Sequence, residues 1–197
     1  LYERKNAKAS WKANGESFPV VLGRSGMAVG DVIADPKTAK VKKEGDGNSP
    51  AGVFPLIATF GRGSKPNAVE MDHTILAEST ECIDDTRSSH YNRVVDRFKV
   101  GNFDWKSSEK MAAIDQYALG VIVGYNSYPV EKGHGSCIFL HIWRDASTAT
   151  EGCTAMERRN VERIVGWLSP DKTPYLVQMP EKLYSDSRKA WRLPKLK

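Results

Sequence analysis

The 197-residue sequence predicts a mostly β domain with one or two helices and a long irregular excursion. The β-branched apolar run 119–125 and the apolar run 136–143 have the length and composition of buried strands. One helical periodicity lies between 155 and 168, and polar turns with glycine separate the other runs. No repeat or linker divides the chain, so we expect a single domain over residues 1–197.

The first half alternates short apolar runs with turns. Residues 18–23 form an apolar run that glycines stop, and the charged, glycine-rich segment 44–48 is typical of a chain reversal. A strand is expected over 49–56, with Pro50 at its start, where a missing N–H does little harm. Residues 61–68 indicate a loop.

The excursion covers residues 79–110, which are polar and irregular with scattered aromatic side chains. Segments of this length without regular structure are usually functional in a compact domain. We expect it to form one wall of a substrate groove, with Tyr91 and Trp105 among the groove residues together with Tyr125 and Asn126.

In the second half, His141 lies near the end of the predicted strand 136–143. An amphipathic helix is predicted to end at Pro170, and residues 174–179 return as a strand. The apolar positions of the helix follow the i, i+3, i+4, i+7 pattern: Val161, Ile164, Val165 and Leu168.

Charge and composition exclude some classes of protein. The net charge is +5, and residues 157–197 carry ten Lys and Arg against five Asp and Glu, whereas residues 1–156 carry nineteen of each. The basic tail, 181–197, is compatible with an anionic partner, although an ordinary solvated surface is the simpler interpretation. No zinc-finger spacing or basic–aromatic run indicates a nucleic-acid partner, and no apolar run predicts a transmembrane segment.

The three cysteines, Cys82, Cys137 and Cys153, are too few for a disulfide framework and too far apart for a zinc site. In an exported protein Cys82 and Cys137 can pair and leave Cys153 free; the alternative is that both are buried, inert thiols. The sequence begins at Leu1 with no signal peptide, so location must be argued from chemistry.

Cys153 and His141 together predict a thiol acyl-transfer site, because a thiolate nucleophile needs a base or a positive field. We expect Cys153 at or just before the N-terminus of a helix over 155–168, with an oxyanion hole formed by the N–H groups of 152–154. Gly152 allows close approach of the substrate, and the Thr150 hydroxyl can orient the site beside Thr154.

His141 is the expected base, and a structural histidine is the alternative interpretation of this residue. His134, in a polar turn, is a second candidate for the base.

Four segments carry a resemblance to a known family: 49–54 (SPAGVF), 139–141 (FLH), 150–153 (TEGC) and 173–177 (TPYLV). In this order they resemble the YkuD-type L,D-transpeptidase catalytic domain over about residues 18–180. The resemblance implies a β-sandwich-like fold with a cysteine nucleophile and an upstream histidine base. These roles fall on Cys153 and His141.

The sequence departs from the family pattern at three places, as a divergent branch would. Glu151 stands where the family usually has a second histidine, Ala155 replaces a common Arg or Asn, and the loop from His141 to Cys153 is shorter. We expect Arg144 or Arg158 to bind a stem carboxylate instead, the alternative being that both are solvated.

The resemblance implies acyl transfer on peptidoglycan tetrapeptide stems. The terminal D-alanine leaves through a thioester, and a cross-link or attachment of an amine acceptor follows. The alternatives are an L,D-carboxypeptidase, another peptidoglycan hydrolase or amidase, or an inactive wall-binding module. No metal or cofactor is implied, the location is periplasmic or otherwise in the bacterial envelope, and no oligomeric state is predicted.

Overall fold

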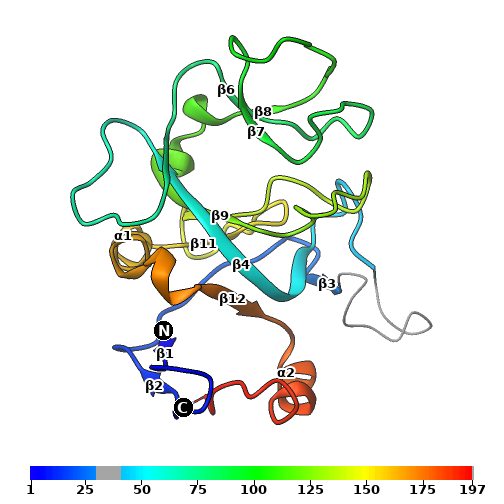
Figure 1. Cartoon of the computed structure of the whole chain (residues 1–197). Helices are drawn as coiled ribbons and strands as arrows, with labels where there is room; N and C mark the ends of the chain where they lie inside the picture. The colour runs from blue at the N-terminus through cyan, green and yellow to red at the C-terminus, as the bar shows by residue number, and fades with distance from the viewer. Residues whose placement is uncertain (30–40, 197) are drawn as a thin grey trace.

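The computed structural model describes residues 1–29 and 41–196 and is mostly β, as the sequence predicts (Figure 1). Its strands in chain order are β1 (Tyr2–Glu3), β2 (Lys12–Ala13), β3 (Met27–Val29), β4 (Ser49–Gly61), β5 (His73–Ile75), β6 (Thr80–Cys82), β7 (Val94–Asp96), β8 (Glu109–Lys110), β9 (Leu119–Val123), β10 (Phe139–Ile142), β11 (Thr154–Met156) and β12 (Tyr175–Gln178). The α-helices in the described residues are α1 (Arg158–Trp167) and α2 (Glu181–Ser187), and short 3-10 turns cover Met111–Ala113, Asp115–Ala118 and Pro170–Lys172.

The main sheet has the order β11-β10-β9-β4-β12, and β3 and β5 also pair with β4. The neighbours β10 and β11 are parallel, whereas β9 pairs antiparallel with both β10 and β4. The long strand β4 crosses the molecule (Figure 1) and pairs with β9 on one side and with β12 on the other. A register shift between Leu56 and Ala58 marks a bulge, where such a strand can bend.

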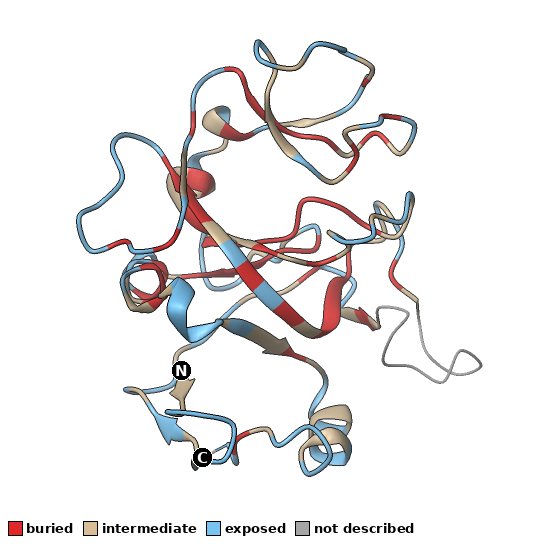
Figure 2. Ribbon diagram, in the orientation of Figure 1, coloured by how far each residue is buried: buried red, intermediate tan, exposed pale blue. Residues whose placement is uncertain are grey.

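Alternate residues of β9 and β10 face two separate cores. Leu140 and Ile142 belong to a core that includes Val161, Ile164 and Val165 of α1, so the helix covers this face of the sheet. Phe139 belongs to a second core on the other face, which we call the cysteine-side core because it contains Cys153. This separation follows from the period of two along a strand. Figure 2, in the orientation of Figure 1, shows buried segments along β4 and the neighbouring strands of the main sheet.

The cysteine-side core is covered by the excursion, which is more regular than predicted. It forms a three-stranded sheet of order β7-β6-β8, followed by two 3-10 turns. Glu81, fully buried in β6, accepts hydrogen bonds from Trp105 Nε1 (2.9 Å) and Ser108 Oγ (2.6 Å) and an ion pair from Lys110 (2.5 Å). The sequence did not predict this sheet because its segments lack an apolar strand pattern. Polar side chains bind a buried carboxylate here, where most strands have apolar packing.

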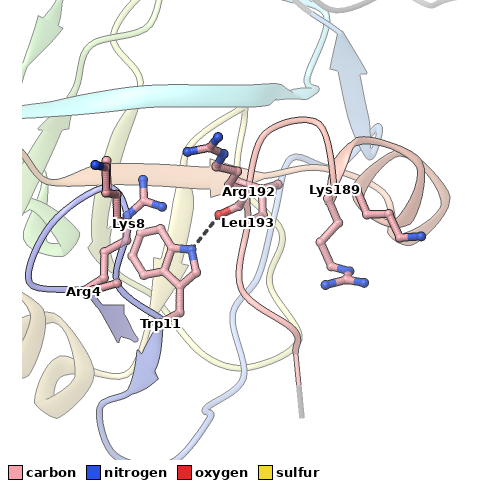
Figure 3. A pocket seen from close by; sticks show the side chains of 9 residues that line it. Arg4, Lys8, Trp11, Lys189, Arg192 and Leu193 are labelled. Atoms are coloured by element: carbon pink, nitrogen blue, oxygen red, sulfur yellow. Dashed lines mark hydrogen bonds between the residues drawn. The ribbon is translucent and has the colours of Figure 1, made fainter.

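The two ends of the chain lie together below β12 (Figure 1). Trp11 Nε1 donates to the Arg192 carbonyl oxygen at 2.7 Å, and the Arg4 guanidinium lies over the Trp11 ring at 4.3 Å. These residues border a surface hollow of about 520 Å³ (Figure 3). Its lining includes five cationic side chains and no acidic one: Arg4, Lys8, Arg188, Lys189 and Arg192.

Candidate functional site

Cys153 lies immediately before strand β11, and α1 begins only at Arg158. The expectation of a helix N-terminus at Cys153 is therefore wrong. Residues 154–156 pair with β10 as a parallel strand, with Leu140 opposite Thr154 and Ile142 opposite Met156. Sheet pairing takes Ala155 and Met156 out of the predicted helix 155–168, so the helix dipole does not act directly on the thiol.

The Cys153 sulfur is enclosed by backbone groups. The Phe139 N–H donates to Sγ at 3.3 Å, and the thiol donates to the Cys137 carbonyl oxygen at 3.3 Å. The residue is only 7% exposed. Burial, followed by the nearby Glu109 carboxylate, raises the pKa of the Cys153 thiol to about 12, although the Phe139 N–H opposes this shift. The Cys153 thiol is therefore protonated at neutral pH.

His141 lies on β10, on the same face of the sheet as Cys153, because the register places it opposite Ala155. Its Nδ1 lies 2.8 Å from the Ile142 carbonyl oxygen. A carbonyl can only accept, so Nδ1 carries the proton and Nε2 keeps the lone pair that a base requires. Burial lowers the pKa of His141, which keeps the ring neutral at neutral pH.

Tyr117, in the 3-10 turn before β9, lies beside both predicted catalytic residues. Its ring meets the His141 ring edge-on, with centroids 5.2 Å apart, and it belongs to the same buried core as Cys153, whose charge affects the pKa of its hydroxyl. The Tyr117 hydroxyl also donates to Glu109 Oε2 at 2.7 Å. Among the described contacts, none is a direct hydrogen bond between His141 and Cys153. Such bonds are often long before substrate binds.

Cys82 and Cys137 form a disulfide and Cys153 is free, which is the pairing considered for an exported protein. The bond ties β6 of the excursion to the segment before β10. Asn92 of the excursion reinforces this link, because its Oδ1 accepts the Cys137 N–H at 2.9 Å and its Nδ2 donates to the Tyr125 carbonyl at 3.0 Å. The excursion thus holds the backbone that contacts the thiol.

The glycine-rich turn 44–48 and the start of β4 contact the loop that carries Cys153. Ser49 Oγ accepts the Gly23 N–H at 2.9 Å and donates to the Cys153 carbonyl at 3.1 Å. Thr150 Oγ1 donates to the same carbonyl at 2.6 Å and accepts the Gly152 N–H at 3.2 Å. A Cβ on Gly152 would stand 3.1 Å from the Asn48 carbonyl oxygen, so glycine is needed for this close approach.

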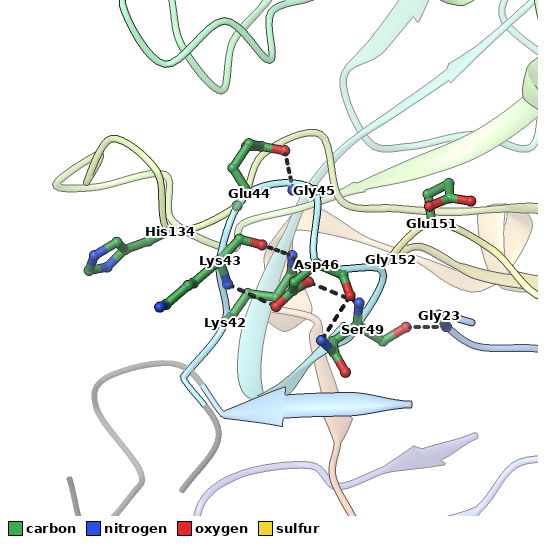
Figure 4. A network of polar contacts seen from close by, with 12 residues as sticks. Gly23, Lys42, Lys43, Glu44, Gly45, Asp46, Ser49, His134, Glu151 and Gly152 are labelled. Atoms are coloured by element: carbon green, nitrogen blue, oxygen red, sulfur yellow. Dashed lines mark hydrogen bonds and ion pairs between the residues drawn. The ribbon is translucent and has the colours of Figure 1, made fainter. Parts of the chain in front are cut away.

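Just before this turn, the buried Lys42 ammonium is bound by Asp46 of the turn at 2.7 Å (Figure 4). Burial raises the pKa of Asp46, but hydrogen bonds from Lys42 and from the backbone of Lys43 and Asn48 outweigh it, and the pKa falls to about 2. Lys42 also contributes a positive field that lowers the pKa of Cys153.

Glu151 and Ala155, where the sequence departs from the pattern described above, have different surroundings. Glu151 is exposed and forms an ion pair with Arg24 Nε at 2.7 Å, so it occupies the surface side of the loop. Ala155 is buried beside His141, and its N–H donates to the Val21 carbonyl at 2.9 Å. Thr154, next to Cys153, directs its hydroxyl to Gln178 Oε1 at 2.5 Å.

The two arginines predicted to bind a carboxylate lie in different places. Arg144 is exposed two residues beyond the end of β10. Arg158 begins α1, which covers the opposite face of the sheet, and its guanidinium lies 3.9 Å from Glu162. The structure therefore does not bring Arg158 to the face of Cys153, whereas Arg144 follows the strand of His141.

The predicted groove residues are committed to contacts inside the protein. Trp105 is buried with its N–H on Glu81, and the Tyr125 hydroxyl donates to the His134 carbonyl at 2.5 Å. Asn126 uses its amide to close its own turn, donating to the Gly135 carbonyl at 2.9 Å. Tyr91 is buried with its hydroxyl on Glu44. These side chains shape the loops around the site and are not open groove surfaces.

His134 is partly exposed, and its ring contacts Glu131 at 2.9 Å. The sequence analysis missed Tyr117, Glu109 and the Phe139 N–H, which surround the thiol. The available signal was weak: Glu109 and Tyr117 are polar residues that frame the end of the excursion, just before a buried strand.

Within residues 1–29 and 41–196, no group of three or more His, Cys, Asp or Glu could hold a metal ion. In that same part of the chain, no helix has the length and apolar character needed to cross a membrane. The family model of the L,D-transpeptidase catalytic domain, YkuD, matches residues 4–177. Neither a curated protein nor a solved structure matches the chain at a significant level.

Proposed function

Because the chain belongs to the YkuD L,D-transpeptidase family, we propose that it is a cysteine-dependent acyltransferase acting on tetrapeptide stems of peptidoglycan. The observation that carries this proposal is that Cys153 and His141 lie on one face of the parallel pair β10–β11, where Tyr117 contacts the His141 ring and shares a buried core with Cys153. A buried thiol beside a neutral imidazole is the arrangement that acyl transfer requires.

In the first step His141 Nε2 takes the Cys153 proton as sulfur attacks the carbonyl carbon of the third stem residue. Proton transfer must accompany attack, because the resting thiol is protonated and His141 is neutral. The Cys153 N–H is the proposed oxyanion donor, since the Gly152 N–H is already bound by Thr150 and Thr154 is paired with β10 in the sheet. His141 then returns the proton to the amine of D-alanine, which leaves.

The second step resolves the thioester. An amine of another stem gives a cross-link and regenerates the thiol, whereas water gives a tripeptide stem. The first outcome is a transpeptidase and the second an L,D-carboxypeptidase. We propose Arg144 as the residue that binds a stem carboxylate, because it follows the strand of His141 and is exposed.

We propose that the protein acts in the cell envelope, periplasmic or otherwise exported. Its substrate class lies there, and the Cys82–Cys137 disulfide supports this location because such bonds persist in oxidising compartments.

The test is mass spectrometry of purified tetrapeptide muropeptides incubated with the wild type, Cys153→Ala and His141→Gln. We expect the wild type to release D-alanine and both variants to lose at least about a hundredfold in rate. Arg93→Gln, an exposed residue of the excursion, is the matched surface control.

Release of D-alanine that survives Cys153→Ala would refute the thioester route. Cleavage at another wall bond would identify an amidase or other hydrolase, and binding to wall without any product would identify a wall-binding module.

A further inference from the structure

Glu109, Tyr117 and Cys153 form a chain of polar side chains beneath the excursion. The central residue, Tyr117, is 5% exposed and is held in place by ring contacts with Phe60, Phe139 and His141. Its hydroxyl donates to Glu109 Oε2 at 2.7 Å, and Tyr117 shares a buried core with Cys153, whose thiol pKa it influences. A phenolic hydroxyl has one proton to donate, so it can serve only one of these neighbours as donor at a time.

The charges around Glu109 disfavour its ionised form. Although part of the residue reaches the surface, its carboxyl group lies against buried Tyr117. Burial, followed by the carboxylates of Asp84 and Glu44, raises the pKa of Glu109 to about 7, and the Tyr117 hydrogen bond opposes this rise. Cys153 is the third acidic group near it, whereas Lys42 acts on the thiol from the other side. Glu109 makes no ion pair among the described residues.

We propose, on the basis of the function proposed above, that Glu109 and Tyr117 are a positioning pair whose hydrogen-bond direction controls formation of the Cys153 thiolate. When Glu109 is ionised, the Tyr117 hydroxyl donates to it and has no proton left for sulfur, and the S–H of Cys153 donates to the Cys137 carbonyl. The thiol is then favoured. When Glu109 is protonated, its O–H donates to Tyr117, whose own hydroxyl turns to donate to sulfur. The thiolate is then favoured.

Charge acts in the same direction as hydrogen bonding. An ionised Glu109 repels a thiolate across a medium of low polarity, and a neutral Glu109 does not. Loss of one proton from Glu109 therefore makes the next proton harder to remove from Cys153. The two groups titrate as a coupled pair.

The test follows alkylation of Cys153 by iodoacetamide from about pH 5 to about pH 9, because alkylation requires a thiolate but no wall substrate. Cys153 is the free cysteine of the described chain, so the reaction is specific. In the wild type the logarithm of the rate should rise with pH, flatten as Glu109 ionises near pH 7, and rise again. In Glu109→Gln the flattening should vanish. This variant should match the wild type at low pH and react about tenfold faster above pH 8, equivalent to about one pKa unit.

Tyr117→Phe supplies a second readout. Without the tyrosine hydroxyl, Glu109 loses the hydrogen bond that lowers its pKa, so the flattening should move to higher pH. Glu78→Gln, an exposed carboxylate just before the excursion, is the matched control and should keep the wild-type profile. Thermal unfolding of each variant establishes that it is folded.

A flattening that persists unchanged in Glu109→Gln overturns the pair, and so does a variant that changes the rate equally at every pH, as a merely structural role would. Failure of the proposed function gives a different result: no D-alanine is released while the pH profiles of alkylation stay as expected. D-alanine release with profiles insensitive to Glu109 overturns the pair alone.

Discussion

The backbone carbonyl oxygen of Cys137 accepts the thiol proton of Cys153 at 3.3 Å, while the Cys137 side chain is bonded to Cys82. One residue, Cys137, therefore joins Cys153 to the excursion that covers it. Cys137 has a positive φ of 56°, and Asn92 Oδ1 accepts its N–H, so its carbonyl is held in one direction. The excursion and Cys153 are therefore linked through Cys137.

Replacing both bonded cysteines, as Cys82→Ser with Cys137→Ser, should lower stability by about 3–4 kcal/mol, because the bond closes a long loop of the unfolded chain. Urea unfolding measures this loss. Cys153 should also become more reactive toward iodoacetamide, since its carbonyl partner is freed. Unchanged reactivity in a folded double variant would show that the disulfide does not restrain the thiol.

Asp46→Asn should destabilise the protein by about 3 kcal/mol, because it leaves the buried Lys42 ammonium without its carboxylate. The chain provides a matched control in Lys182 and Asp186, which have the same spacing and the same 2.7 Å separation but are exposed. Asp186→Asn should cost less than about 0.5 kcal/mol. Equal losses in the two variants, measured by urea unfolding, would contradict the role of burial.

Acid should reveal the same ion pair. The pKa of Asp46 is lowered from 3.8 to about 2 in the folded protein, so its contribution is complete above pH 3.8 and is lost as the pH falls toward 2. Thermal unfolding between about pH 5 and pH 2 should show a smaller acid-induced loss in Asp46→Asn than in the wild type. Parallel curves for the two proteins would exclude Asp46 as a source of acid sensitivity.

Ser49→Ala removes a buried hydroxyl that joins Gly23 to the Cys153 carbonyl. We expect a loss of about 1–3 kcal/mol, because two buried backbone groups lose a partner. D-alanine release should fall as the loop of Cys153 loosens. Ser107→Ala, at an exposed position of the excursion, should change neither quantity. Wild-type release by a folded Ser49→Ala would show that this hydroxyl does not position the loop.

Glu109→Gln should alter the dependence of stability on pH. The pKa of Glu109 is raised from 4.5 to about 7, so the folded state holds a proton that the unfolded state releases, and stability falls as pH rises from 4.5 to 7. The variant lacks this loss. Its melting temperature relative to the wild type should therefore be higher at pH 8 than at pH 4, and a constant difference would rule out the titration.

The strands and the main helix could be predicted because their signals are local. The β-branched run of β9 and the apolar run of β10 lie within the predicted strands 119–125 and 136–143, and the apolar stripe of α1 begins at Val161 as expected. β11 could not be predicted, because its three residues become a strand only by pairing with β10, fourteen residues earlier along the chain. Because β11 was not predicted, the helix was predicted to begin at 155, whereas α1 begins at Arg158.

The sequence predicts Cys153 and His141 as a nucleophile and a base from residue type and order, and the structure places both on one face of the sheet. The sequence does not predict their surroundings. Glu109 and Tyr117 reach the thiol only because the excursion folds back over the sheet and a disulfide holds it there. Tyr125 and Trp105 were misassigned to a groove for a related reason: aromatic side chains give the same signal whether they line a surface or fill an interior.

The two-sided character of β10 divides the effects of mutation along a single short strand. Leu140 and Ile142 face the helix, while Phe139 and His141 face the cysteine. In a saturation scan of residues 139–142, substitutions at 140 and 142 should therefore lower the amount of folded protein. Substitutions at His141 should lower the turnover of each folded molecule. Selection for a new substrate can change residues on the cysteine face and leave the structural support on the other face intact.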